Sequence, residues 1–183
     1  MIPFEQQRRS LLFALGGLGV GPFLPGVFGE GQPGARHGSV LGAGEGEHLV
    51  HFRDRGDIFI KLGAASGSAD LAVGTQQVMV GTGIPIHRHS RMDEAFYVLE
   101  GSGHVVMNDV RHAFEKGGTI VIPRNTWHGF ENPAHQLLLL WVVTPAGLDG
   151  FFRETCSPPG IPGKAFTREQ IGEIGLRHDT EFR

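Results

Sequence analysis

Short apolar runs separated by turn residues recur through the middle of this chain and constrain its fold more than any other feature. The candidate strands are residues 58–62, 71–80, 95–99, 104–107, 119–122 and 136–143. Turn signals such as Gly101-Ser102-Gly103 and Asn108-Asp109 lie between them, in a chain with 29 glycines and 11 prolines. No helix-period segment interrupts the strands, which disfavours a parallel βαβ sheet. The pattern predicts an all-β sandwich or barrel.

Composition limits the size and the partners of the protein. With 183 residues, of which 40% are hydrophobic, the chain can form one domain with a buried core but not two of ordinary size. The net charge is -3 and there is no basic stripe, so we expect no nucleic-acid partner. The single cysteine, Cys156, excludes an intrachain disulfide framework and a cysteine-rich zinc site.

The beginning of the chain has the features of an export signal. Arg8-Arg9 precedes an apolar stretch from Leu11 to Val20. That stretch is too short for a bilayer core, which needs about 20 residues. The adjacent arginines resemble a twin-arginine signal, although Phe13 stands where that signal has a polar residue. A floppy or amphipathic N-terminus on a cytoplasmic protein is the alternative. We predict a signal over residues 1–29, a periplasmic or secreted protein, and no stable membrane anchor.

The rest of the chain divides by composition. We expect a glycine-rich flexible linker, a β domain and a C-terminal helical extension over residues 30–46, 47–145 and 146–183. Within the extension, residues 148–155 suit a short helix. Thr167 and Gln170 have the spacing of a capping box, which predicts a helix over residues 168–177 that docks on the β domain.

A group of histidines around one glutamate carries the chemistry. His87 and His89 lie two residues apart in an extended segment, so their side chains point to the same face. Glu94 begins the next strand and His128 follows another turn into a strand, so both can reach the same point. Three neutral imidazoles and one carboxylate suit a divalent metal such as Fe, Mn, Ni, Cu or Zn. The spacing by itself leaves a chance grouping of histidines equally open.

Residues 81–101 resemble the first motif of the cupin superfamily. That motif is a glycine, five residues, His-x-His, three or four residues, a glutamate, six residues and a second glycine. Every fixed position is met, by Gly81, His87, His89, Glu94 and Gly101.

The second cupin motif follows at a spacing that fits one cupin domain. It is a glycine, five residues, Pro-x-Gly, two residues, a histidine, three residues and an asparagine. The matching positions are Gly117, Pro123, His128 and Asn132. Asn125 stands where the motif has a glycine. Asparagine tolerates the left-handed backbone conformation better than most residues, so we expect the turn to be kept.

The resemblance implies a fold and a metal site. The fold is a single jelly-roll cupin barrel of antiparallel strands, here with a short C-terminal helical extension. The implied metal ligands are His87, His89, Glu94 and His128. They would hold one divalent transition metal (Fe, Mn, Ni, Cu or Zn) and leave one or two positions for substrate, water or dioxygen. The ligand set does not choose among these metals.

Apolar residues near the ligands are candidates for a substrate pocket. They are Met79, Phe96, Val98, Phe130 and Trp141. Phe96 and Val98 share the strand face of Glu94, and Phe130 shares that of His128. Such residues equally suit the barrel core. The apolar strand over residues 137–143 likewise suits either a homodimer interface, as is common in the family, or a buried core strand.

The residues leave three functions open. Similarity to small quercetin-dioxygenase-like cupins implies a dioxygenase-like enzyme on a small oxygen-chelating substrate, with Glu94 as the catalytic base for a substrate hydroxyl. A non-redox isomerase or lyase would typically place Lys or Arg in its pocket for phosphate or carboxylate. Few basic residues lie on the predicted inner faces, which counts against phosphorylated substrates. The third function is a non-catalytic cupin that binds a small ligand.

Overall fold

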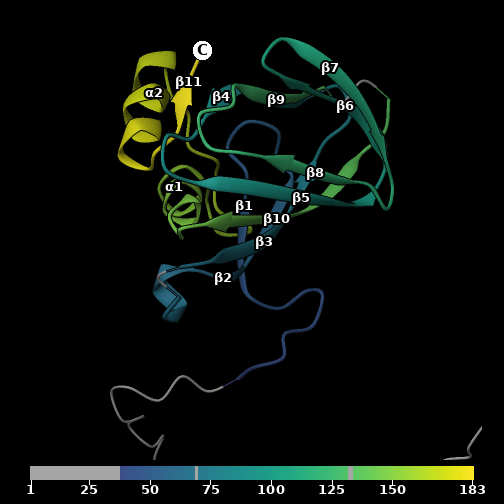
Figure 1. Cartoon of the computed structure of the whole chain (residues 1–183). Helices are drawn as coiled ribbons and strands as arrows, with labels where there is room; N and C mark the ends of the chain where they lie inside the picture. Colours follow the sequence, from purple (N-terminus) through teal and green to yellow (C-terminus); the bar gives the residue numbers. More distant parts are fainter. Residues whose placement is uncertain (1–37, 69, 132–133) are drawn as a thin grey trace, which may run out of the picture. The chain divides into compact units, whose positions relative to one another are not determined.

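Strands with alternating buried and exposed side chains build two antiparallel sheets (Figure 1). This computed structural model describes residues 38–68, 70–131 and 134–183. The six-stranded sheet consists, in order of hydrogen bonding, of β1 (Glu47–Val50), β2 (Asp57–Leu62), β3 (Ala72–Val78), β10 (Leu137–Thr144), β5 (Asp93–Glu100) and β8 (Thr119–Ile122). The five-stranded sheet consists of β11 (Glu181–Phe182), β4 (Gly83–Arg88), β9 (His128–Glu131), β6 (Ser102–Met107) and β7 (Val110–Glu115). A single 3-10 turn, η1 (Ala64–Ser66), lies between β2 and β3.

The two sheets form a jelly roll, but they are not hydrogen-bonded into one closed barrel as the sequence resemblance implies. Among the described residues, each sheet keeps its own edge strands, β1 and β8 in one and β11 and β7 in the other. The inner faces of the sheets supply the core. In this arrangement side chains rather than backbone hydrogen bonds join the sheets, so a cavity can form between them.

Strand β10 shows how the period of two builds the core. Leu137, Leu139, Trp141 and Val143 are fully buried, whereas the residues between them are only partly buried. The apolar run is therefore a core strand on one of its faces. The homodimer stays a prediction, and the exposed Tyr97 on β5 is one apolar residue available to it.

Left-handed backbone conformations close the turns that the motifs require. Asn125 has φ 64°, which confirms that asparagine takes over the glycine position of the second motif. Its backbone N–H donates to the carbonyl of His89 at 2.6 Å, so this turn is tied to the first motif. Asn108 and Asp109, with φ 47° and 66°, form the predicted turn between β6 and β7.

The C-terminal extension is helical as predicted. The helix α1 spans Leu148–Thr155 and α2 spans Arg168–Arg177. The capping box of α2 is present. The backbone N–H of Gln170 donates to the Thr167 hydroxyl at 3.2 Å, and the backbone N–H of Thr167 donates to the side-chain oxygen of Gln170 at 2.9 Å. After α2 the chain returns to pair β11 with β4, so both helices lie at one end of the sheets (Figure 1).

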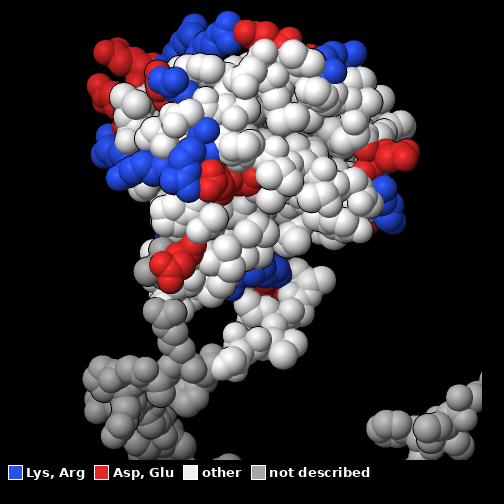
Figure 2. Space-filling model, viewed as in Figure 1, with Lys and Arg blue, Asp and Glu red and all other residues white. Residues whose placement is uncertain are grey.

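The predicted signal, residues 30–37 of the predicted linker, and Asn132 of the second motif lie outside the described residues. In the part that is described, no helix has the length and apolar character needed to span a membrane. Figure 2 shows charged side chains of both signs around the margin of one face, with a broad uncharged area over β8.

Candidate metal centre

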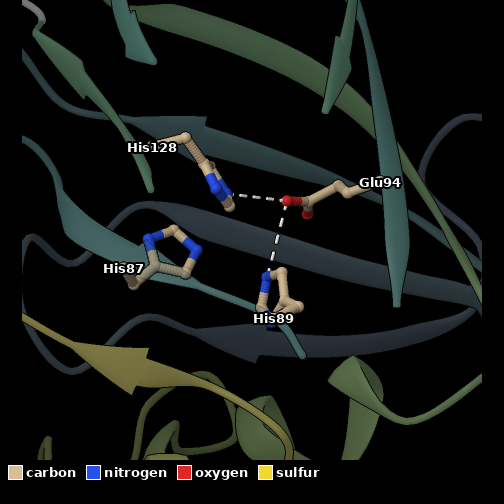
Figure 3. Close-up of side chains that lie close together, drawn as sticks. All are labelled: His87, His89, Glu94 and His128. Carbon is tan, nitrogen blue, oxygen red and sulfur yellow. Dashed lines mark hydrogen bonds and ion pairs between the residues drawn. The ribbon is translucent and has the colours of Figure 1, made fainter. Parts of the chain in front are cut away.

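The two sheets bring His87, His89, Glu94 and His128 together at one point between them (Figure 3). His87 lies on β4 and faces His128, its register partner on the neighbouring strand β9. His89 follows β4 directly, and Glu94 approaches from β5 in the opposite sheet. All four residues are buried, and one ligand atom from each lies within 4.8 Å of the others. The structure thus assembles the whole ligand set that the motifs imply.

Backbone carbonyls orient the three imidazoles. The Nδ1 of His87 lies 2.8 Å from the carbonyl of Pro85, and that of His128 lies 2.9 Å from the carbonyl of Thr126. The Nδ1 of His89 lies 2.9 Å from the carbonyl of Asp179. A carbonyl only accepts, so each Nδ1 carries the proton and each Nε2 keeps its lone pair. Such outer hydrogen bonds are typical of metal-binding histidines.

The Nε2 and carboxylate atoms have the separations of ligands around one ion. The Glu94 Oε2 atom lies 3.0 Å from the Nε2 of His128 and 3.5 Å from that of His89. Two ligands about 2.1 Å from an ion, at 90° to 109°, lie about 3.0 to 3.4 Å apart. The His89 Nε2 is also buried without a hydrogen-bond partner among the described residues. These residues therefore fit a divalent metal.

Burial and mutual charge keep the cluster in a form that can bind a cation. Burial first, and then the neighbouring His128 and His89, lower the pKa of His87 well below its usual value. Burial would raise the pKa of Glu94, but the neighbouring imidazoles of His128 and His89 outweigh it and lower that pKa. Burial likewise opposes protonation of His89, yet Glu94 raises its pKa. Protons and a metal therefore compete at His89, so metal binding should weaken in acid.

One side of the cluster opens on a cavity of about 340 Å³. His87 and Glu94 line it, and its other walls come mainly from aromatic and aliphatic side chains of β5, the two helices and β11. The principal apolar residues are Phe52, Ile84, Phe96, Leu148, Phe151, Phe152, Phe166, Ile171 and Phe182. The volume lies in the range of small-molecule sites.

Comparison with known proteins agrees with the motifs and the site. Residues 74–144 match the cupin domain family Cupin_2. The chain contains a cupin domain. This cupin is 28% identical to Quercetin 2,3-dioxygenase of Bacillus subtilis over 121 residues, which make up 65% of this chain and 35% of that protein. It is 38% identical to an uncharacterized protein of Methanocaldococcus jannaschii over 55 residues, or 30% of this chain and 44% of that protein. The cupin thus spans less than half the length of either relative.

Solved structures show the same fold. KdgF from Halomonas sp. matches with a TM-score of 0.52 and 22% identity, over 62% of this chain and 98% of that chain. The polyketide cyclase RemF from Streptomyces resistomycificus matches with a TM-score of 0.53 and 19% identity, over 74% of this chain and 91% of that chain. At this identity the likeness establishes the fold alone.

Of the predicted pocket residues, only Phe96 lines the cavity of this cupin. Val98 and Trp141 are fully buried in the core, and the Phe130 ring packs between those of Phe96 and Phe114. Met79 is half-buried just beyond β3. These four side chains are not among those lining the cavity, because sharing a strand face with a ligand places a residue in the core as readily as in a pocket.

Most of the cavity wall comes from segments that sequence reasoning treated as structural. The C-terminal extension supplies Phe151, Phe166 and Phe182, and the turn after β1 supplies His51 and Arg53. No local spacing connects these residues with the cupin motifs. The expectation of few basic residues on the inner strand faces does not extend to these other segments, which bring three arginines to the cavity. Arg53 lies in a turn, and the other cavity arginines lie in the C-terminal extension.

His51 gives the cupin a testable pH dependence. Burial, aided by Arg53 and opposed by Asp54, lowers the pKa of His51 from 6.5 to about 3. Between these values the unfolded chain binds a proton at His51 that the folded protein does not, so the free energy of unfolding falls as the pH is lowered through this window. We expect His51→Gln to reduce that fall in the metal-free protein, as measured by urea denaturation at several pH values. If the free energy of unfolding falls equally with pH in the two proteins, the lowered pKa of His51 is contradicted.

Proposed function

We propose that this cupin is a mono-metal enzyme with dioxygenase-like chemistry on a small organic substrate that chelates through oxygen. The observation that carries the proposal is that two of the four clustered residues, His87 and Glu94, also line a largely aromatic cavity. A substrate in that cavity can therefore reach the ligand cluster while its body rests on apolar walls. The similarity to Quercetin 2,3-dioxygenase, over 65% of the chain, supports dioxygenase-like chemistry.

Each residue of the site has a definable part in such a reaction. The three histidines and Glu94 would hold the metal, with the backbone carbonyls fixing the ring orientations. A bound divalent metal supplies a Lewis acid and, for Fe, Mn, Ni or Cu, redox chemistry with dioxygen. Glu94 reaches both the cluster and the cavity, so one carboxylate oxygen can accept the proton of a substrate hydroxyl. The aromatic walls limit the access of water to that proton transfer.

A non-redox isomerase or lyase is a second candidate, and one observation favours it. Arg53, Arg168 and Arg183 line the cavity, which supplies the basic groups that such an enzyme uses to hold an anionic substrate. The two candidates differ in one measurable quantity, the consumption of oxygen.

The test combines metal loading with oxygen uptake. The purified chain is loaded separately with Fe, Mn, Ni, Cu and Zn, and oxygen is followed together with substrate loss on flavonols and diketones. We expect oxygen consumption that matches substrate loss with a redox metal and is absent with Zn. Glu94→Gln should lower kcat by about 100-fold or more, because the proton acceptor is lost. Glu100→Gln, an exposed change on the same strand, should leave kcat unchanged.

Other outcomes contradict the proposal in distinct ways. Metal-dependent substrate loss without oxygen uptake would favour the isomerase or lyase. Tight binding of a substrate that no metal-loaded form converts would favour a non-catalytic ligand-binding cupin.

A further inference from the structure

We propose that the cavity takes an organic anion, an amphipathic carboxylic acid with an aromatic or aliphatic body, and that Arg53 binds its carboxylate. This inference names the substrate class and rests on the proposed function only in taking the cavity as the substrate site. Arg53 would be a specificity-determining residue outside the metal cluster.

The guanidinium of Arg53 lines the cavity, and two of its three nitrogens have no hydrogen-bond partner among the described residues. Its Nε and Nη2 atoms are buried and have no hydrogen-bond acceptor among the described residues. The Nη2 atom forms an ion pair with the Asp54 carboxylate at 3.6 Å, a separation too long for a hydrogen bond. Burial lowers the pKa of Arg53, which reflects the cost of removing this cation from water. An incoming carboxylate would compensate that cost with charge-assisted hydrogen bonds.

Asp54 does not meet this need, because its carboxylate is engaged elsewhere. Oδ1 accepts from the Gly56 amide at 3.2 Å, and Oδ2 accepts from the Met79 amide and the Thr82 hydroxyl, each at 3.3 Å. These bonds tie the turn after β1 to the end of β3. Asp54 therefore spends its hydrogen bonds on the turn and on Thr82. It offers Arg53 an ion pair but no hydrogen bond, so a ligand carboxylate can supply the hydrogen bonds that Nε and Nη2 lack.

His51 provides a second donor beside Arg53. Its Nδ1 accepts a hydrogen bond from the Arg53 amide at 3.1 Å, so the neutral ring carries its proton on Nε2. The ring packs against Phe52 at 4.7 Å and edge-on against Phe152 at 6.4 Å between centroids. In the described part of the chain nothing accepts from Nε2, and His51 lines the same cavity. It can donate to an oxygen of the ligand without adding charge.

The remaining walls fix the sign of the ligand and the nature of its body. Arg168 and Arg183 line the cavity as well, and Glu94 is the only acidic residue among the described residues that line it. Arg183 is also paired with Asp109 at 2.9 Å, whereas Arg168 has no ion pair in the described ranges. The cavity therefore attracts anions. Its many phenylalanines exclude a fully polar anion such as free phosphate in favour of one with an apolar body.

The test compares acids with their uncharged amides. The probes are cinnamate, 4-phenylbutyrate, indole-3-acetate and octanoate, each paired with its amide, and Kd is measured by calorimetry on the full chain. We expect at least one acid to bind at least about tenfold more tightly than its amide. The preference for acid over amide should fall to within about twofold in Arg53→Gln. It should persist in part in Arg53→Lys, which keeps the positive charge but lacks the paired N–H donors of a guanidinium. Arg111→Gln, an exposed arginine away from the cavity, should keep the full preference.

Each measurement is made on chelator-treated and on Zn-loaded protein, so that a carboxylate held by the metal is recognised. An acid preference that Arg53→Gln removes in metal-free protein supports the proposal even if no metal-dependent reaction is found. Equal binding of acid and amide across the panel would overturn it. A preference present only with Zn and unchanged in Arg53→Gln would overturn it too. Thermal unfolding confirms that each variant is folded. If Arg53→Gln does not fold, the preference for acid over amide is compared between Arg53→Lys and the natural protein instead.

Discussion

Alanine in place of His89 is expected to remove the metal from the purified protein. The side chain is 2% exposed, its Nε2 has no hydrogen-bond partner among the described residues, and its ring is held in place by the Asp179 carbonyl. Without the His89 imidazole, only three of the four candidate ligands are left. Elemental mass spectrometry should find about one equivalent of metal in the natural protein and below about a tenth in the variant.

Two further measurements separate metal loss from unfolding. His112→Ala removes an exposed histidine on β7 and should keep the full equivalent of metal. Added metal should raise the Tm of the natural protein and of His112→Ala but not that of His89→Ala, because only a ligand that binds the folded state stabilises it. Undiminished metal in folded His89→Ala, or none in the natural protein after loading with each metal, would contradict the assignment of the site.

Removal of residues 179–183 is expected to weaken metal binding by about 10- to 100-fold, although none of them is among the four candidate ligands. The Asp179 carbonyl accepts from the His89 ring, and its carboxylate accepts from the Arg91 amide at 2.8 Å. Further along, Glu181 pairs with Arg88 of β4 at 2.7 Å. The end of the chain therefore holds the first motif in its binding conformation, and the His89 ring would turn more freely without it.

A shorter deletion is the matched control. Removing residues 182–183 takes away cavity wall but leaves Asp179 and its bonds, so metal affinity should change by less than about threefold. Both forms are titrated with Zn²⁺ in competition with a chromogenic chelator, and circular dichroism verifies the fold. Equal affinity for the two truncated forms would show that the Asp179 carbonyl does not contribute to the site.

Local spacing predicted the cluster only in part, and the resemblance to the cupin motifs supplied the full set of four residues. Side chains two residues apart on an extended segment point the same way, which places His87 and His89 together. The turn before His128 depends on a residue that accepts a left-handed conformation, and Asn125 fills that role at φ 64°. The strands and the α2 cap follow from similarly short-range rules, the period of two and the Thr167–Gln170 capping box.

The cavity could not be found in this way. Whether Phe96 faces a pocket and Val98 the core depends on what packs against each, and alternation along β5 gives both the same face. Likewise, Arg53 stands in a turn far along the chain from the cupin motifs, with no periodic signal of its own.

The amino-acid sequence by itself therefore determined the fold family and the four clustered residues through the cupin motifs, and the C-terminal helices through local signals such as the capping box. Only the tertiary structure decided that the C-terminal extension walls the cavity, that Asp179 supports His89, and that Arg53 reaches the site. Those features arise where distant segments pack together. Such packing depends on the shape of the whole core, which no short stretch of residues encodes.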